Sequence, residues 1–306
     1  MNSFKPITIK GSVVAITGGA RGIGLATARR FAAAGARVAI GDLDLAAAQD
    51  SARTLGIDAT GYQVDVGDRE SFAAFIDRVE SEVGPIDVMV NNAGIMPVGA
   101  LLDGTEAVAQ ATMSANFWAH YHALRTVAPR MVHRGRGHII NVTSAAGKVH
   151  SPGLAIYVAS KHAATGLSRS AREELLGTGV SVTAVLPSAV RTQLLDGIPF
   201  RWWERLAIVS PDRIARVITG TLRRRPALVG APRGLIPLLN AAAFVPEFLW
   251  MWGRRVSDAD RVMGPIDREQ RAEYDSRIDG QTIELVQDPG SDTAPARQAI
   301  SQGQTS

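Results

Sequence analysis

The sequence predicts an α/β fold, a doubly wound parallel sheet of six to seven strands with helices on both faces. Three observations lead to this prediction. Short runs rich in valine and isoleucine alternate with helix-like stretches along the chain. These runs are almost continuously apolar, as strands buried on both faces are. The first run leads directly into a glycine-rich stretch that opens a helix, which is typical of the first crossover in such a sheet.

The individual elements follow from hydrophobic periodicity and from the residues at their ends. The predicted strands are residues 13–17, 37–42, 60–65, 86–94, 137–144 and 179–187, with 227–230 as a candidate seventh. The predicted helices between them are residues 22–34, 44–55, 68–83, 105–132 and 155–177. A later helix is expected after Ser210, because serine is a favourable N-cap and Pro211 suits the first turn.

The chain divides into three predicted parts. Residues 1–230 form the sheet domain, residues 231–280 a C-terminal helical extension, and residues 281–306 a polar tail that we expect to be disordered. The N-terminus lacks the apolar core of a signal peptide, so we expect a cytoplasmic protein. The chain has no cysteine, which excludes disulfides and thiolate metal sites.

Positive charge is concentrated in one part of the sequence. Between Arg201 and Arg255 there are ten arginines against three acidic residues, in a chain whose net charge is +4. Such a surplus suggests an anionic neighbour, such as a phosphate group or a membrane surface, or else a solvated basic face. We expect no nucleic-acid partner.

The glycine-rich stretch is TGGARGIG, residues 17–24, with Gly18, Gly22 and Gly24 in the spacing T-G-x-x-x-G-x-G. A turn from strand into helix presents backbone N–H groups and the positive end of the helix dipole. Glycines allow a pyrophosphate to approach that backbone closely. The stretch therefore predicts a dinucleotide site.

Asp42 bears on the choice of dinucleotide. It ends the second predicted strand, 18 residues after Gly24. A carboxylate there can accept hydrogen bonds from both hydroxyls of the adenosine ribose and would repel a 2′-phosphate, so NAD is favoured over NADP. Arg21 leaves NADP open, because a basic residue in the loop can hold a 2′-phosphate. Asp42 can also be read as a simple strand-end turn residue.

A second motif, YVASK, places Tyr157 and Lys161 four residues apart. On a helix these side chains share a face. A free tyrosine has a pKa of about 10, and a neighbouring ammonium group moves that pKa toward the working range of a base. Ser144 ends the preceding predicted strand, where its hydroxyl can bond the reacting oxygen of a substrate. The three residues predict general acid–base chemistry.

These motifs together resemble the short-chain dehydrogenase/reductase family, in its single-domain branch. The matching residues run in family order over roughly residues 10–195. They are TGGARGIG at 17–24, Asp42, Val64, Asp65, NNAG at 91–94, Asn116, NVTS at 141–144, YVASK at 157–161 and PSAVRT at 187–192. The resemblance implies a Rossmann-type fold and an enzyme that oxidises alcohols or reduces carbonyls.

The resemblance also implies roles for the catalytic residues. Tyr157 would be the general acid/base, and Lys161 would lower its pKa and bind the nicotinamide ribose. Ser144 would position the substrate oxygen, and Asn116 would hold a water molecule in a proton relay. The hydride chemistry would belong to the cofactor, while the protein supplies orientation and the proton.

The cofactor, NAD with NADP not excluded, would likewise be held by residues carried over from the family. They are Gly18, Arg21, Gly22, Ile23, Gly24, Asp42, Asp65, Val66, Asn92, Ala93, Gly94, Tyr157, Lys161, Pro187, Val190 and Thr192. Asp65 and Val66 would contact the adenine, Asn92 the adenosine ribose region and Thr192 the carboxamide. One departure is Ser188, which stands where the family usually has glycine.

Six histidines remain, and none forms a convincing metal set with carboxylates, so no metal is expected. His150 lies on the predicted loop between Ser144 and Tyr157 and is a candidate pocket residue or a plain loop residue.

The segment 193–209 is expected to cap the substrate, by resemblance to the family. It carries Phe200, Trp202 and Trp203, which suit a bulky apolar alcohol or carbonyl of steroid, retinoid or lipid type. The alternative is that the tryptophans pack in the core or in a subunit interface. The expected assembly is a homo-oligomer, a dimer or a tetramer.

A second apolar stretch, LIPLLNAAAFVPEFLWMW, occupies residues 235–252. Its prolines interrupt a helix, and Asn240 and Glu247 would be costly in hydrocarbon, so we do not expect it to span a membrane. Two interpretations stay open. The segment is a lid or oligomer contact, or it lies in a membrane interface. In the second case its tryptophans would lie at headgroup depth and nearby arginines would face anionic lipid. These residues are Trp250, Trp252, Arg223, Arg224, Arg225, Arg233, Arg254 and Arg255.

Two functions are compatible with the motifs. The favoured one is a dinucleotide-dependent oxidoreductase acting on an apolar alcohol or carbonyl. The alternative is a dinucleotide-binding regulator or scaffold without turnover, which would have no need of Ser144, Tyr157 and Lys161 together.

Overall fold

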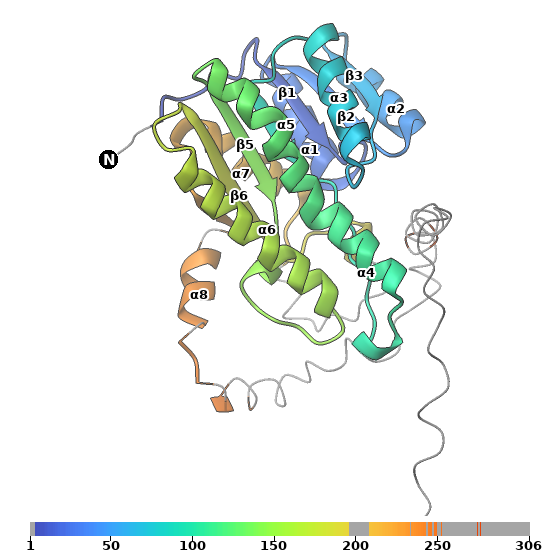
Figure 1. Ribbon diagram of the computed structural model, residues 1–306, viewed down its shortest axis with the longest axis vertical. Coiled ribbons are helices and arrows are strands. Elements are labelled where there is room, and N and C mark those ends of the chain that lie inside the picture. Colours follow the sequence, from blue (N-terminus) through green and yellow to red (C-terminus); the bar gives the residue numbers. More distant parts are fainter. Residues whose placement is uncertain are drawn as a thin grey trace, which may run out of the picture.

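The computed structural model describes residues 4–195, 208–232, 234–242, 244–246, 248–249, 252, 274 and 276. Seven parallel strands form one sheet in the order β3-β2-β1-β4-β5-β6-β7 (Figure 1). The predicted fold class is confirmed, including the seventh strand. The strands are β1 Val13–Thr17, β2 Arg37–Asp42, β3 Ala59–Gln63, β4 Val88–Asn91, β5 Gly137–Val142, β6 Val180–Pro187 and β7 Leu228–Ala231. The strand order reverses between β1 and β4, which is where ligands bind in such sheets.

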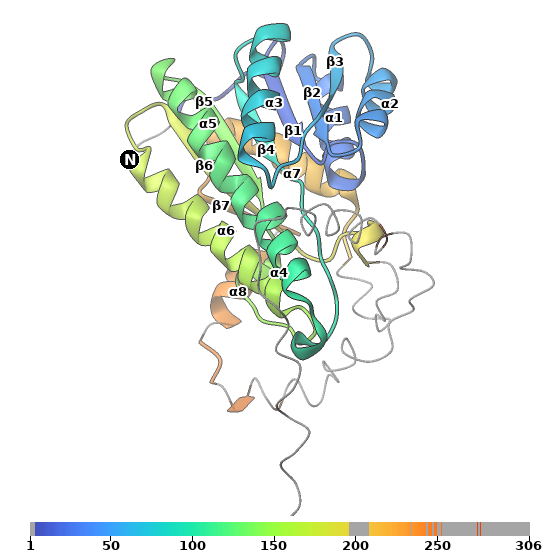
Figure 2. The ribbon, with the colours of Figure 1, turned by 45° about the vertical axis from the view of Figure 1, so that its right-hand side comes forward.

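Helices cover both faces of the sheet (Figure 2). On one face α1 Gly22–Ala33, α2 Leu45–Leu55 and α7 Pro211–Arg224 enclose a core that includes Phe31 and Ile218. On the other face α3 Arg69–Glu82, α5 Ala119–His133 and α6 Ala155–Glu174 pack over Phe72 and Met131. The strands are buried on both sides, which explains their continuous apolar sequences.

The predicted helix over 105–132 is not one regular helix. It comprises α4 Glu106–Met113, a five-residue π-helix η2 Ser114–Trp118, and α5. A π-helical turn inserts an extra residue into the α-helical ladder, and such turns occur often at functional sites. Hydrophobic periodicity does not reveal the π-helical turn, because the turn only rotates the apolar face of α5 relative to that of α4. The turn contains Asn116.

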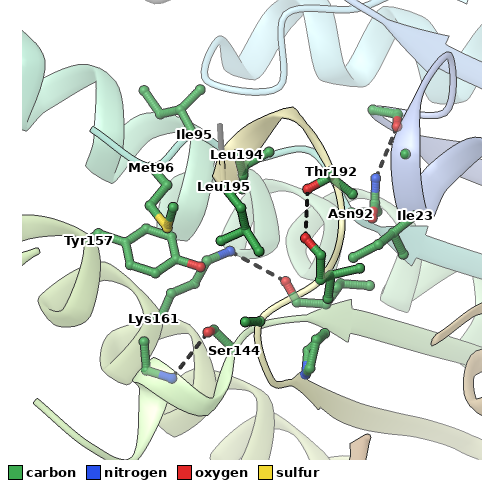
Figure 3. Close-up of a pocket in the computed structure, with 18 of the residues that line it drawn as sticks. Ile23, Asn92, Ile95, Met96, Ser144, Tyr157, Lys161, Thr192, Leu194 and Leu195 are labelled. Atoms are coloured by element: carbon green, nitrogen blue, oxygen red, sulfur yellow. Dashed lines mark hydrogen bonds between the residues drawn. The ribbon is translucent and has the colours of Figure 1, made fainter. Parts of the chain in front are cut away.

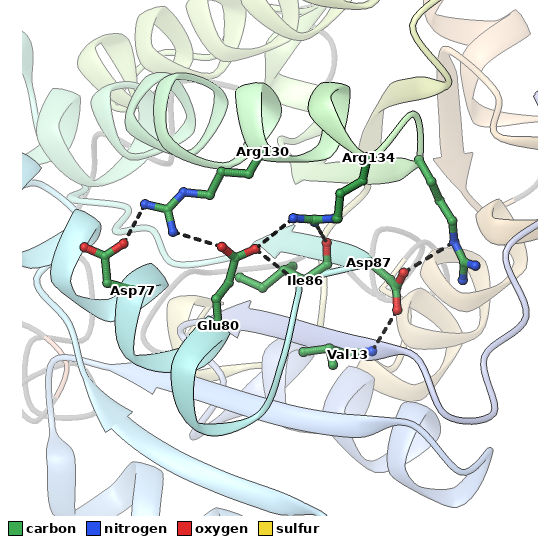
Figure 4. Close-up of polar contacts among 8 residues, drawn as sticks. Val13, Asp77, Glu80, Ile86, Asp87, Arg130 and Arg134 are labelled. Carbon is green, nitrogen blue, oxygen red and sulfur yellow. Dashed lines mark hydrogen bonds and ion pairs between the residues drawn. The ribbon is translucent and has the colours of Figure 1, made fainter.

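An ion-pair network fastens α3 to α5 at the edge of the sheet where the strands begin (Figure 4). Arg130 binds Asp77 at 2.5 Å and Glu80 at 2.9 Å. Arg134 binds Glu80 at 3.2 Å and donates to the Ile86 carbonyl at 2.7 Å. Glu80 binds both arginines, so the three side chains form a network. A network of this kind holds its partly exposed side chains in place better than an isolated surface ion pair does. The network braces the edge opposite the strands' carboxyl ends.

In the membrane-interface interpretation Arg225 was one of the arginines that would face lipid, and the structure corrects this. It follows α7 in the left-handed conformation with φ 46°, and its side chain is only 2% exposed. Its guanidinium donates to the carbonyls of Gly137 at 3.3 Å and Gly179 at 3.1 Å, which precede or begin β5 and β6. Arg223 and Arg224 lie at the same end of α7. These arginines are therefore at the amino-end edge of the sheet, away from the apolar segment.

The apolar segment begins with α8, Leu235–Ala242, which follows β7 at the carboxyl-end edge (Figures 1 and 2). Leu239 is buried against Ala184 and Leu186 of β6, whereas Leu238 is 67% exposed. In the part of the chain that the structure describes, no helix is both long and apolar enough to cross a membrane. Four residues of the membrane-interface interpretation lie outside the described residues: Arg233, Trp250, Arg254 and Arg255. Glu247 lies outside them as well. The predicted tail 281–306 also lies outside them, and the predicted domain boundaries stay predictions.

Candidate active site

A cavity of about 810 Å³ opens at the carboxyl ends of the strands, beside the β1/β4 switch point. Most of the predicted site residues line it, and Figure 3 shows several of them. The predicted residues in its wall are Gly18, Arg21, Gly22, Ile23, Asn92, Ala93, Gly94, Ser144, Tyr157, Lys161, Pro187, Val190 and Thr192. Five others do not reach the wall: Gly24, Asp42, Asp65, Val66 and Asn116.

The glycine loop is packed against the stretch that follows β4. Gly18 has φ +60°, and a Cβ there would lie 2.8 Å from the Ala93 Cα. A Cβ on Gly24 would lie 2.1 Å from the Gly18 carbonyl oxygen, so no side chain fits without a backbone shift. The Asn92 amide nitrogen donates to the carbonyls of Thr17 at 3.1 Å and Gly18 at 3.0 Å. In this structure the Asn92 side chain therefore holds the loop.

Asp42 lies at the end of β2, behind the loop. Its carboxylate accepts hydrogen bonds from the backbone N–H groups of Ala20 at 3.2 Å and Asp44 at 3.3 Å. Burial raises the pKa of Asp42, while these hydrogen bonds and the nearby Arg21 oppose the increase. Arg21 itself pairs with Asp44 at 2.7 Å. Arg21, the residue that left NADP possible as the cofactor, is thus already paired with the Asp44 carboxylate.

Asp65 and Val66 follow β3. The Asp65 carboxylate accepts from the Gly67 N–H at 2.8 Å, which shapes the turn leading into α3. Val66 is buried in the core beneath α3. Both residues stand near the carboxyl-end edge, and their predicted contact with adenine stays a prediction.

Tyr157 and Lys161 lie on the buried face of α6, as their spacing predicts. They are 7% and 5% exposed, and the Lys161 Nζ is 5.6 Å from the centre of the Tyr157 ring. The ammonium group donates to the Val142 carbonyl at 3.4 Å. Burial lowers the pKa of Lys161 to about 8. The charged form of Lys161 is therefore easily lost in the mildly alkaline range.

The pKa of Tyr157 differs from the expectation that Lys161 would lower it. Burial raises this pKa, and the hydrogen bond with the Ser144 hydroxyl opposes the increase. Ser144 is the N-cap of the short helix η3 Ala145–Gly147. Its hydroxyl accepts a hydrogen bond from the Ala146 N–H at 3.1 Å. The phenol therefore keeps its proton at neutral pH, so a proton is present for transfer to a substrate oxygen.

Asn116 lies behind the cavity, completely buried in the π-helix. Its amide oxygen accepts from the Ile95 N–H at 3.0 Å, and its amide nitrogen donates to the Ile95 carbonyl at 2.8 Å. The same nitrogen donates to the Ser160 hydroxyl at 3.0 Å, and that hydroxyl donates to the Tyr157 carbonyl at 2.7 Å. The side chain thus connects η2, the segment after β4 and α6. The predicted water relay stays a prediction.

His120 was not predicted to belong to the site. It is completely buried, and its Nδ1 lies 2.8 Å from the Asn116 carbonyl oxygen, so Nδ1 carries the donated proton. Burial and the charge of Lys161 lower the pKa of His120 to about 3. The sequence shows that His120 comes four residues after Asn116. It does not show that the two residues are hydrogen-bonded at a π-helical turn.

Ser188, which stands where the family usually has glycine, does not disturb the hydrogen bonding of the loop after β6. The Ser188 N–H donates to the Ala231 carbonyl at 2.9 Å, which extends the pairing of β6 with β7. Val190 forms an isolated parallel bridge with Val209, and the Thr192 hydroxyl donates to the Val190 carbonyl at 3.3 Å. These contacts keep residues 187–192 in the cavity wall.

The rest of the wall is largely apolar. It includes Ile95, Met96, Leu154, Leu194, Leu195 and Tyr274. Leu194 and Leu195 belong to the segment 193–209 that was expected to cap the substrate, whereas the other apolar residues of the wall were not predicted. Short apolar residues in loops carry no distinctive sequence signal, so only the tertiary structure identifies them. Phe200, Trp202 and Trp203, the predicted substrate cap, lie outside the described residues. His150 is exposed and does not line the cavity, although its neighbour Ser151 does.

Comparison with known proteins decides the family. Residues 12–199 match the family model described as short chain dehydrogenase. The chain belongs to the short chain dehydrogenase family. As a member, it is an oxidoreductase that acts on CH–OH groups, and the resemblance drawn from its motifs is confirmed.

Individual members of the short chain dehydrogenase family are similar over most of their length. The chain is 40% identical over 190 residues to 1-deoxy-11-beta-hydroxypentalenate dehydrogenase of Streptomyces exfoliatus, covering 60% of this chain and 69% of that one. It is 29% identical over 281 residues to 17-beta-hydroxysteroid dehydrogenase 13 of Rattus norvegicus, covering 90% of this chain and 88% of that one. The crystal structure of a short chain dehydrogenase/reductase from Burkholderia phymatum in complex with NAD superposes with a TM-score of 0.70. That comparison covers 76% of this chain and 93% of the other at 23% identity.

Proposed function

We propose that this short chain dehydrogenase uses NAD to interconvert a bulky apolar alcohol and its carbonyl compound. The observation that carries the proposal is the meeting of Ser144, Tyr157 and Lys161 with the glycine loop in the wall of one cavity. A protein that only sensed a dinucleotide would have no use for a buried tyrosine and lysine beside the nicotinamide end of its site.

The residues present fit NAD. Gly18 and Gly24 allow a pyrophosphate to approach the amino end of α1, which no side chain caps in the described structure. Asp42 offers a carboxylate for the adenosine ribose, and Arg21 is paired with Asp44. Thr192 would hold the carboxamide and Lys161 the nicotinamide ribose. The proposal agrees with the NAD complex of the Burkholderia phymatum relative.

When bound, the nicotinamide accepts or supplies the hydride. The protein's own part is to orient the substrate and to move one proton. Ser144 donates a hydrogen bond to the substrate oxygen, and the Tyr157 hydroxyl gives that oxygen a proton in carbonyl reduction or receives one in alcohol oxidation. Lys161 stabilises the phenolate that remains after reduction. Asn116 positions the backbone of Tyr157 through Ser160.

Tyr157→Phe tests this mechanism. The substitution removes the proton donor and keeps the ring, so we expect turnover to fall by about 10²–10⁴-fold, the usual contribution of a general acid–base. NAD affinity, measured by fluorescence titration, should change little. Tyr121→Phe, on the surface of α5, is the matched control and should behave as wild type. Equal turnover in Tyr157→Phe and wild type would favour the regulator hypothesis instead.

The apolar substrate class is supported by the wall around the reacting groups. Ile95, Met96, Leu154, Leu194 and Leu195 all line the cavity. Contacts of this kind bind hydrocarbon better than hydroxylated compounds. A panel of steroids, retinoids, long-chain alcohols and small polyols, assayed with NAD and NADP, tests the class. Higher kcat/KM on the polyols would contradict it.

We also propose that the apolar segment docks in a membrane interface. Beyond Leu238, the side chains of Phe244, Phe248 and Trp252 are 87%, 69% and 66% exposed. Exposed residues of this size in one segment mark an interaction surface, and it adjoins the edge where the cavity opens. Such a position would let a lipophilic substrate enter from the membrane.

Vesicle flotation tests the docking proposal with the full chain. Wild type should float with vesicles containing anionic phospholipid, and Phe244→Glu combined with Phe248→Glu should not. Ile57→Glu, which adds a charge at a 100% exposed site before β3, at the opposite edge of the sheet, is the control and should still float. A wild-type chain that remains at the bottom of the gradient contradicts docking.

Self-association is a third proposal. Trp118 and Tyr121 are 44% and 38% exposed on η2 and α5, and their rings pack edge to face with centroids 5.6 Å apart. Exposed aromatic residues of this kind are enriched in protein interfaces. Light scattering after chromatography should give a dimer or tetramer for wild type and a smaller species for Trp118→Glu.

A further inference from the structure

One residue from far along the chain lines the cavity of the active site. Tyr274 is 7% exposed and lines the same cavity as Ser144 and Tyr157. Its hydroxyl accepts a hydrogen bond from the Met96 N–H at 2.8 Å, across 178 residues of sequence. Both partners are buried, so this contact is shielded from competing water.

The Tyr274 ring belongs to a small apolar cluster at the cavity wall. It packs with Ile95 and Ala111, and the partly buried Ala115 and Leu194 complete the group. This cluster is separate from the two cores that flank the sheet. The ring is therefore not needed to cover the sheet, and its burial serves the wall of the cavity.

The hydrogen bond fixes a backbone that the site depends on. Asn116 holds both the N–H and the carbonyl of Ile95 from behind, and Tyr274 holds the N–H of the next residue, Met96. The side chains of Met96 and Leu194 project into the cavity in the region of the Tyr157 ring (Figure 3). Tyr274 thus contributes its ring to the apolar wall and holds the backbone of Met96.

We propose that Tyr274 is a specificity-determining residue: its ring limits the length of the apolar substrate, and its hydroxyl positions Met96 against that substrate. The inference rests on the proposed function, because it assigns a wall of the same substrate pocket. Tyr274 performs no proton transfer. It acts on the fit of the substrate and not on the cofactor.

Variants of the full chain separate the ring from the hydroxyl. The assay measures kcat, KM and NAD affinity for secondary alcohols of increasing chain length. Tyr274→Ala should shift the ratio of kcat/KM between long and short alcohols toward the long ones by about tenfold or more, since one methylene in an apolar pocket is worth about 10–200-fold. Tyr274→Phe should keep the wild-type length preference and raise KM a few-fold with kcat nearly unchanged. NAD affinity should be unchanged in both.

The controls distinguish the possible failures. Leu176→Ala removes an exposed apolar side chain after α6, outside the cavity, and should leave the length preference unchanged. Thermal unfolding identifies a variant that does not fold, and Tyr274→Leu then replaces Tyr274→Ala. If wild type oxidises the alcohols and the folded variant, Tyr274→Ala or its replacement Tyr274→Leu, keeps the wild-type length preference, the inference is wrong and the proposed function stands. If wild type oxidises none of them but turns over polyols, the proposed function fails and the inference falls with it.

Discussion

At the scale of single residues, the reactive pair differs from the simple picture of a lysine that lowers the pKa of a tyrosine. Burial raises the pKa of Tyr157 and lowers that of Lys161 to about 8. Desolvation penalises the charged form of each group and is the largest cause of both shifts. The protonated tyrosine is ready to act as an acid, whereas its action as a base needs higher pH.

The pH dependence of the reaction should follow from this. Carbonyl reduction needs the Tyr157 proton and should be nearly constant from about pH 6 to about pH 8, while alcohol oxidation should rise with pH. Lys161→Met removes the cation and should lower oxidation by about 10²-fold or more. Lys10→Met, far from the cavity, is the control. Initial rates in both directions check this, and oxidation that is independent of pH would contradict it.

The preference for NAD should depend on two neighbouring carboxylates with different roles. Asp42→Ala removes the acceptor for the ribose and should weaken NAD by about tenfold or more, the value of a charge-assisted hydrogen bond. Asp44→Ala instead releases Arg21 from its ion pair, so NADP should gain affinity while NAD changes little. Fluorescence titration with both dinucleotides separates the two effects. No gain of NADP in Asp44→Ala would show that Arg21 does not face the 2′ position.

At the scale of elements, the first βα turn depends on the close approach of two glycines. Gly24→Ala places a methyl group 2.1 Å from the Gly18 carbonyl, so the turn must move. We expect NAD affinity to fall at least about tenfold, because backbone donors at a helix amino end must meet the pyrophosphate closely.

A glycine inside a helix provides the matched control for this prediction. A methyl group added at Gly166 of α6 would enter open space, with nothing within 4 Å of it. Gly166→Ala should leave NAD binding unchanged and stabilise the helix by up to about 1 kcal/mol. Calorimetric titration and thermal unfolding provide the two measurements. Wild-type affinity in Gly24→Ala would mean that the turn does not hold the pyrophosphate.

The π-helical turn is the element that joins the site to the fold. The turn rotates the chain between α4 and α5, so that the Asn116 side chain bonds Ile95 and Ser160. The apolar face of α5 still packs against the sheet. The sequence predicted a helix here and named Asn116, but not the contacts that the turn creates. Those contacts depend on segments that meet only after the sheet has formed.

At the scale of the whole molecule, buried histidines connect stability to pH. His120 and His138 are both completely buried, and burial lowers the pKa of each to about 3. In the unfolded chain the pKa is about 6.5. The unfolded state therefore binds more protons below about pH 6.5. Stability is complete above that pH and is lost as the pH falls toward about 3, by about 2 kcal/mol per histidine at about pH 5.

His138→Gln tests this linkage, because glutamine can keep a polar contact with Ser181 or Thr221, which His138 bonds at 2.9 and 3.1 Å. The variant should lose less stability than wild type between about pH 7.5 and about pH 5 in urea unfolding. His133→Gln, on an exposed site, should follow wild type. An unchanged pH dependence in His138→Gln would contradict the assignment.

The sequence by itself determined the sheet, its helices, the glycine loop and the acid–base residues. Strand and helix periods are local, and β1, β2 and α1 begin or end within one residue of their predicted bounds. The motif residues are also local, because spacing along one turn or one helix fixes their relative positions. Tyr157 and Lys161 share a face of α6 for this reason.

The tertiary structure alone decided what surrounds those motifs. Tyr274 reaches Met96 across 178 residues, Arg225 turns inward to the strand starts, and His120 is buried within reach of the lysine's charge. None of these contacts has a short-range signature, because each forms between segments that only the packing of the sheet brings together. The chemistry could be predicted from local spacing, whereas the shape of the substrate pocket depends on long-range packing.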